Sequence, residues 1–130
     1  MSGVYPGLEN LIATMATLRG EDGCPWDREQ THASLVEHLV EEAFELVEAL
    51  EAGSRDDIRE ELGDVLYQVL FHADIAAAYP EGAFTIDDVA ADVDAKMRER
   101  HPHVFAEGAA SSEVDMLACW QGNTADYDKP

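Results

Sequence analysis

The sequence predicts an all-α protein, a bundle of about five helices, and three observations support this fold class. Apolar residues recur at helical spacing in several segments, and signals typical of helix starts and ends flank most of these segments. No segment shows sustained apolar and polar alternation rich in β-branched residues, which is the pattern of a half-buried strand. No internal repeat of solenoid length is present.

The first expected helix covers residues 8–18 and ends at Gly20. Its apolar residues are spaced as on one face of a helix: Leu8, Leu11, Ile12, Met15 and Leu18. The stretch RGEDGCPWDREQT that follows has the glycine, proline and aspartate content of an ordered loop. Asp27 and Gln30 have capping-box spacing and could start a short helical turn within it.

Two longer helices are expected next. Ser34 and Glu37 form a capping pattern for a helix that runs to about Ala52 and ends at Gly53. Ser54 then caps the longest helix, which continues to about Tyr79 before Pro80.

The C-terminal part predicts two further helices. Thr85 and Asp88 cap a helix through about Arg100, and Pro102 is expected to break it. A last short helix should begin near Ser112 and include Leu117 and Trp120.

Length and composition predict one folded domain over residues 1–130, with a core from about 8 to 121 and a flexible tail at 122–130. The chain has 28 acidic and 8 basic residues, so nucleic acid and anionic membrane surfaces are unsuitable partners. No stretch approaches about 20 uninterrupted apolar residues, and MSGVYPGLEN has no basic leader, so no membrane span and a cytoplasmic location are expected. Two distant cysteines suggest neither a disulfide framework nor a structural zinc site.

Carboxylates are concentrated in EEAFELVEAL at 41–50 and in EELGDVLYQVLFHAD at 60–74. On the first helix, the acids share one side and apolar residues take the opposite arc, a pattern that a solvated acidic face also explains. On the second helix, apolar residues surround the axis almost completely, which indicates a helix buried in a bundle. Two of its acids, Glu61 and Asp64, are therefore expected to face protein.

Buried carboxylates that lie close together need a compensating cation, because each is costly to bury and they repel one another. Arg55 and Arg59 cannot neutralise five converging acids, whereas a divalent metal ion can. A donor set made only of carboxylates favours Mg²⁺, with Mn²⁺ as a possible substitute, over zinc. The five acids are Glu41, Glu42, Glu45, Glu61 and Asp64. His72 lies close enough in the helix to join these ligands, but a single histidine at such a position is more often a core residue or a partner of the ligands.

Three of the eight basic residues lie in KMRER at 96–100. Lys96 and Arg100 share a helical face that suits a polyphosphate, although cations at a helix C-terminus also complement the macrodipole. Trp26 and Trp120 could stack on a nucleobase or pack in the core.

The segments GCPWDREQT, EEAFELVEAL, ELGDVLYQVLFHA and KMRERHPHVF, in this order and spacing, closely resemble the MazG family of nucleoside triphosphate pyrophosphohydrolases. The resemblance covers residues 8–120. It implies an all-α NTP pyrophosphatase fold whose paired helices form a four-helix bundle with a second subunit, and hence a homodimer or a higher homo-oligomer. It also implies that the five acids bind magnesium, that Lys96 and Arg100 contact phosphate, and that Trp120 lies near the nucleotide. Family members commonly carry a lysine where this chain has Thr124.

The expected function is magnesium-dependent hydrolysis of nucleoside triphosphates at the α-phosphorus, yielding a nucleoside monophosphate and pyrophosphate. Glu42 or Glu45 would activate water, and Lys96 and Arg100 would stabilise the leaving group. Trp26 and Trp120 are the candidate contacts to the base. Two alternatives remain open: a pyrophosphatase selective for dUTP or another non-standard nucleotide, and a non-catalytic helical dimerisation or regulatory module.

Overall fold

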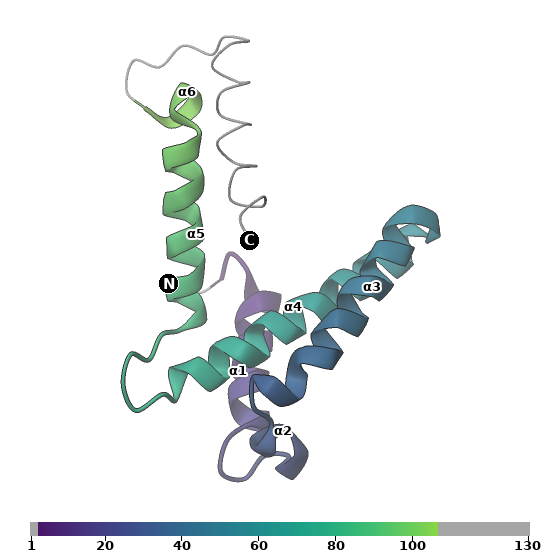
Figure 1. Ribbon diagram of the computed structural model, residues 1–130, viewed down its shortest axis with the longest axis vertical. Helices are drawn as coiled ribbons and strands as arrows, with labels where there is room; N and C mark the ends of the chain where they lie inside the picture. Colours follow the sequence, from purple (N-terminus) through teal and green to yellow (C-terminus); the bar gives the residue numbers. More distant parts are fainter. Residues whose placement is uncertain (1–2, 107–130) are drawn as a thin grey trace. The chain divides into compact units, whose positions relative to one another are not determined.

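The computed structural model describes residues 3–106, and Figure 1 shows that this part of the chain is helical, with no strand among the described residues. Contacts group the chain into two compact units, Met1–Ile86 and Asp87–Pro130, which are described separately below. The all-α fold class is confirmed. The helices are α1 (Pro6–Leu18), α2 (Pro25–Glu29), the 3₁₀ helix η1 (Ala33–Leu35), α3 (Val36–Ala52), α4 (Arg55–Ala77), α5 (Ile86–Arg100) and α6 (Pro102–Phe105).

Helices α3 and α4 pack side by side as a hairpin (Figure 1). Only Gly53 and Ser54 join them, as the sequence predicts. The Ser54 hydroxyl accepts a 3.2 Å hydrogen bond from the Asp57 backbone N–H, and the Asp57 carboxylate accepts one of 3.1 Å from the Ser54 N–H. This reciprocal capping box fixes the start of α4 immediately after the end of α3. The hairpin thus places the acidic segments of both helices opposite each other.

The capping pattern predicted at Ser34 and Glu37 is wrong. Helix α3 begins at Val36 after the 3₁₀ turn η1, and its N-cap residue, Leu35, contributes no side-chain cap. The Ser34 hydroxyl instead takes part in the preceding turn, where it accepts a 2.9 Å hydrogen bond from the Thr31 N–H and donates one of 2.7 Å to Gln30. A serine hydroxyl can cap a helix or form hydrogen bonds within such a turn, and the hydroxyl of Ser34 does the second.

Proline marks the start of three helices, because each of α1, α2 and α6 has a proline at its first helical position. The fixed φ of proline suits that position, where its missing N–H would have no partner in the helix anyway. One expectation is corrected accordingly: the connection after α1 contains a helix that starts at Pro25, so Asp27 does not cap it. The break expected at Pro102 is confirmed, because α5 ends at Arg100 and Pro102 starts α6.

The core of the first unit is formed by side chains from α1, η1 and α4. Its fully buried apolar side chains are Met15, Leu35, Leu70 and Phe71. Arg19, at the end of α1, joins three elements around this core. Its Nε donates a 2.8 Å hydrogen bond to the Asp74 carboxylate, one of its terminal nitrogens donates to the Asp27 carbonyl at 2.6 Å, and its guanidinium lies over the Phe71 ring. α2 is thereby held against α1 and α4.

Gly23 makes the sharp connection between α1 and α2 possible. The Cys24 N–H donates a 2.8 Å hydrogen bond back to the Leu18 carbonyl, and a Cβ at Gly23 would lie 2.1 Å from that carbonyl oxygen. Only glycine fits so close to the backbone of the preceding helix.

A large apolar face of the hairpin is exposed in the single chain, contrary to the expectation that α4 is buried on nearly all sides. Phe44, for example, is 63% exposed. The exposed apolar residues of α3 are Val36, Leu39, Val40, Phe44, Val47 and Leu50, and those of α4 are Leu62, Leu66 and Val69. Most of the arc of α3 that looks like a core face in the sequence is therefore exposed in the described part of the chain.

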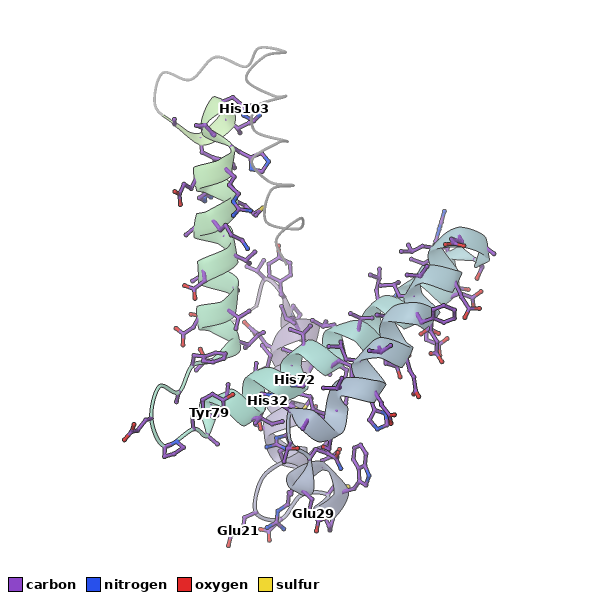
Figure 2. All side chains as sticks on the ribbon, in the orientation of Figure 1. Glu21, Glu29, His32, His72, Tyr79 and His103 are labelled. Carbon is purple, nitrogen blue, oxygen red and sulfur yellow. The ribbon has the colours of Figure 1, made fainter. Side chains whose placement is uncertain are left out.

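A hydrogen-bonded chain of aromatic side chains joins His32, just before η1, to His72 in the C-terminal half of α4 and to Tyr79, just after that helix. The Nδ1 atoms of His32 and His72 are 2.7 Å apart, their rings are stacked, and His32 Nε2 is hydrogen-bonded to the Tyr79 hydroxyl (Figure 2). An Nδ1 to Nδ1 hydrogen bond requires that one ring supply a proton and the other a lone pair. At least one of the two histidines is therefore neutral in the folded protein.

This pair predicts a loss of stability in acid. Burial, and then the neighbouring His32, lower the pKa of His72 below its ordinary value of 6.5. Because the unfolded chain then binds the proton more readily, the contribution of His72 is complete above pH 6.5 and is lost as the pH falls through the lowered pKa. We expect the free energy of unfolding in urea, measured at pH 7.5 and 5.5, to fall more for the wild type than for His72→Phe. Equal losses in the two proteins would show that His72 is not the titrating group.

The second unit is described through α5 and α6. Lys96 and Arg100 lie one turn apart on α5, as predicted. Arg98 is engaged elsewhere, because it forms a 3.3 Å ion pair with Asp94 and lies over the Phe105 ring. The helix expected from Ser112, with Trp120, and the tail with Thr124 lie outside the described residues.

None of the helices in the described part of the chain is both long enough and apolar enough to span a membrane.

Candidate metal and nucleotide site

Four carboxylates converge where α3 and α4 face each other. Glu42 and Glu45 lie one turn apart on α3, and Glu61 and Asp64 lie one turn apart on α4. Each contributes an oxygen, and these four oxygens all lie within 4.8 Å of one another. The two helices thus bring together, across the hairpin, the acids that the sequence separates by 15 residues or more.

The four carboxylates repel one another, and no basic side chain in the described part of the chain pairs with them. Burial, and then the charges of Glu45, Asp64 and Glu41, raise the pKa of Glu42. Burial, and then Glu45 and Asp64 among its acidic neighbours, raise the pKa of Glu61. Each shift means that the ionised carboxylate is disfavoured by lost solvation and by like charge. No basic side chain within residues 3–106 forms an ion pair with any of the four acids.

Two oxygens of the cluster are buried without a partner in the described part of the chain, which suggests that a cation binds there. Glu42 Oε2 and Glu61 Oε2 are buried from solvent and have no hydrogen-bond partner among the described residues. A buried acceptor without a donor is costly, and a cation would satisfy both atoms and offset the repulsion at once. Four oxygens with no thiolate or imidazole among them form a donor set suited to Mg²⁺ or Mn²⁺. The residues of the cluster therefore fit a hard divalent ion.

Solvent reaches the cluster from one side. An open hollow begins at Glu45 and Glu61 and extends toward the turn between the helices, where its lining includes Gly53 and Asp57. Glu45 itself is exposed. An ion or a phosphate can therefore approach without any rearrangement of the hairpin.

The other predicted site residues lie outside this group. Glu41 is exposed on α3 and is not among the four acids whose oxygens converge. Lys96 and Arg100 belong to the second unit, so their part in a site with the carboxylates stays a prediction. Trp120 lies outside the described residues.

Trp26 lies on α2 and contacts the first turn of α3. Its indole meets the His38 imidazole edge to face, with ring centroids 5.9 Å apart and an interplanar angle of 83°. His38 is one turn before Glu42 on α3, so the two side chains share a face of the helix. Trp26 remains 51% exposed despite this contact.

Comparison with known proteins places these features in a family. Residues 30–105, more than half of the chain, match the family model described as the MazG nucleotide pyrophosphohydrolase domain. The chain belongs to the MazG family. The matched residues include the whole α3 and α4 hairpin and all four clustered carboxylates, so the resemblance seen in the sequence is confirmed.

Curated MazG relatives are longer than this chain. Nucleoside triphosphate pyrophosphohydrolase/pyrophosphatase MazG of Thermotoga maritima is 50% identical over 104 residues, which cover 80% of this chain and 40% of that protein. Nucleoside triphosphate pyrophosphohydrolase of Escherichia coli K12 is 42% identical, over 88% of this chain and 43% of that protein. The uncharacterized protein YabN of Bacillus subtilis is 52% identical, over 91% of this chain and 24% of that protein. The chain spans less than half the length of these three relatives.

The MazG fold is also supported by a solved structure. The crystal structure of a mazG-related protein from Thermotoga maritima superposes with a TM-score of 0.67 at 26% identity, covering 89% of this chain and 98% of that one. The similarity extends over nearly all of the other chain, so it concerns the fold as a whole rather than one helix pair.

Sequence reasoning missed two features of this MazG chain. The contact of Trp26 with His38 was not predicted, although the spacing of His38 and Glu42 places both on one helical face. The chain from His72 through His32 to Tyr79 links residues 40 and 47 positions apart, and no local pattern indicates it.

Proposed function

We propose that this chain hydrolyses nucleoside triphosphates at the α-phosphorus and releases a nucleoside monophosphate and pyrophosphate. The observation that carries the proposal is the convergence of four carboxylates with two buried, unpartnered oxygens. Membership of the MazG family supports it, as do the printed names of the relatives from Thermotoga maritima and Escherichia coli.

Glu42, Glu45, Glu61 and Asp64 would hold the divalent cation, with Glu41 as a fifth candidate next to them in sequence. When bound, Mg²⁺ or Mn²⁺ supplies charge neutralisation for the phosphate oxygens and makes the α-phosphorus more electrophilic. Without the cation the four acids repel one another, and the capped hairpin would keep them close together.

The hydrolytic step needs a base. Glu42 or Glu45, through a carboxylate oxygen that does not bind the cation, orients the attacking water and accepts its proton. The water oxygen bonds to the α-phosphorus, and the bond from that phosphorus to the bridging oxygen breaks, so the bridging oxygen leaves with pyrophosphate. Lys96 and Arg100 are proposed, from their shared face on α5, as the cations that stabilise charge on this leaving group.

We infer that a second copy of the chain covers the exposed apolar face of α3 and α4. Two adjacent helices present continuous apolar stripes to solvent there, and a monomer rarely exposes a patch of that extent. The same face on two copies can pair about a two-fold axis, which makes a homodimer the simplest assembly. Such pairing would produce the four-helix arrangement that the family resemblance implies.

Product analysis tests the proposed activity. The protein is incubated with each standard triphosphate and with dUTP, with Mg²⁺ or with a chelator, and pyrophosphate and orthophosphate are measured separately. We expect pyrophosphate without orthophosphate, only with the metal. Orthophosphate as the first product would contradict cleavage between the α- and β-phosphates, and inactivity toward every nucleotide would favour a non-catalytic helical module.

A further inference from the structure

We propose that a histidine clamp, made of His32, His72 and Tyr79, positions the carboxylates of α3 against those of α4, an assignment that rests on the proposed metal site. The Nδ1 atoms of the two histidines are 2.7 Å apart, and their rings are stacked with an interplanar angle of 8°. His32 Nε2 is also hydrogen-bonded to the Tyr79 hydroxyl. Figure 2 shows the three side chains together at the end of the hairpin that lies away from the turn at Gly53 and Ser54.

Hydrogen bonds fix the hairpin at two places, on either side of the acidic cluster. The first is the capping box of Ser54 and Asp57 at the turn. The second is the histidine clamp, because His72 lies eight residues after Asp64 on α4, about 12 Å further along the helix. Glu61 and Asp64 lie between these two places. The position of α3 relative to α4 at the cluster is therefore set from both ends.

The clamp acts on α3 through η1. The Leu35 N–H donates a 3.2 Å hydrogen bond to the His32 carbonyl, and the Val36 N–H donates to the Ala33 carbonyl. η1 ends at Leu35 and α3 begins at the next residue, so the backbone runs directly from His32 into the helix that carries Glu42. A shift of the His32 ring relative to α4 therefore moves the start of α3 with it.

Apolar packing alone restrains α3 less well. Leu35 is buried in the core, but the hydrophobic effect is non-directional, whereas a hydrogen bond fixes a distance and an angle. Most of the apolar arc of α3, including Val40 and Phe44, is exposed in the described part of the chain. Repulsion among the four carboxylates also acts to separate α3 from α4. The clamp opposes this separation at the end of the hairpin that has no covalent connection.

Hydrogen exchange tests the clamp without metal or substrate. His72→Phe keeps an aromatic ring beside His32 but removes the Nδ1 atom that bonds to it. We expect amides in the first turns of α3 to exchange about 2- to 12-fold faster, the range for the loss of one hydrogen bond, and those next to Ser54 to be unchanged. His72→Asn should restore much of the protection, because its amide can place a donor or an acceptor where Nδ1 lies.

Binding of Mn²⁺ tests whether the clamp positions the acids. The electron paramagnetic resonance signal of free Mn²⁺ reports the affinity without any turnover. We expect His72→Phe to weaken binding at pH 7.5 by up to about 12-fold, the same range, and His72→Asn to recover much of the loss. Tyr79→Phe, which removes only a hydroxyl, should change exchange and affinity in the same direction by less, and it applies the same test if His72→Phe does not fold.

Asp74→Asn is the matched control, because it breaks another side-chain link at the same end of α4. Asp74 pairs with Arg19 at 2.8 Å and so joins α4 to the end of α1 rather than to η1. It lies about 15 Å from Asp64 along α4, beyond the screening length of about 8 Å at physiological salt, so the loss of its charge should not alter the affinity for Mn²⁺. We expect this variant to be less stable, with exchange of α3 and binding of Mn²⁺ unchanged.

Each contrary result decides one claim. Unchanged exchange of α3 in His72→Phe, or equal effects of His72→Phe and Asp74→Asn, would overturn the clamp. Faster exchange of α3 with an unchanged affinity for Mn²⁺ would overturn the positioning role and leave the three side chains a structural one. A wild type that does not bind Mn²⁺ would contradict the proposed metal site, and the exchange rates would still decide whether the clamp holds α3 to α4.

Discussion

Glu61→Gln is expected to reduce turnover of nucleoside triphosphates by at least about 100-fold while the helical fold is retained. Glutamine has nearly the same shape as glutamate but lacks its charge, and it replaces one carboxylate oxygen of Glu61 with an NH₂ group that cannot coordinate a cation. Steady-state rates of pyrophosphate release and far-UV circular dichroism measure the two parts of this expectation.

Thermal unfolding gives an independent readout of the same variant. Mg²⁺ should raise the midpoint of the wild type by binding the folded state, and this gain should be lost in Glu61→Gln. In chelator the variant should be at least as stable as the wild type, because a carboxylate disfavoured by burial and like charge has been neutralised.

Glu51→Gln is a suitable control, because it removes an exposed acid near the end of α3 that does not belong to the cluster. It should keep both the activity and the response to Mg²⁺. Near-normal turnover in Glu61→Gln, or an undiminished response of that variant to Mg²⁺, would contradict the metal assignment.

Phe44→Glu is expected to dissociate the proposed homodimer into monomers. Phe44 is the most exposed of the large apolar residues of α3 and α4, and in a two-fold interface one substitution introduces two buried charges. An unpaired charge costs several kcal/mol to bury, so we expect the dissociation constant to rise by at least about 100-fold. Sedimentation equilibrium over a range of protein concentrations measures it.

Val4→Glu is the matched control for this experiment. Val4 is also a highly exposed apolar residue, but it precedes α1 and lies outside the hairpin. It should leave the assembly unchanged. A wild type that is monomeric at all concentrations, or a Phe44→Glu variant that assembles normally, would show that a second copy does not cover this face.

The sequence predicts the fold best where local chemistry decides the structure. The capping box of Ser54 and Asp57 is present because only a short stretch of chain is involved and no other partner competes. The same pattern at Ser34 failed because Thr31 and Gln30 lie close enough to engage the hydroxyl first. A serine in a capping motif can bond either to the helix or to nearby turn residues, and the sequence alone does not show which partner its hydroxyl takes.

Periodicity identifies residues that share a face but not what covers that face. Val40, Phe44 and Val47 read as core in the sequence, yet they are exposed in the single chain. An apolar face has the same pattern in the sequence whether it packs within the chain or is proposed to pack against a second molecule. The predicted set of five acids includes all four clustered carboxylates. It also includes Glu41, whose part in the site stays a prediction, because spacing alone does not separate the neighbours Glu41 and Glu42 without the position of α4.

Turnover of ATP in water enriched in ¹⁸O tests attack at the α-phosphorus most directly. Cleavage between the α- and β-phosphates gives the same two products whichever phosphorus is attacked, but the label enters the phosphorus that water attacks. The proposed mechanism predicts one ¹⁸O in AMP and none in pyrophosphate when Mg²⁺ is present. Label in pyrophosphate would contradict it.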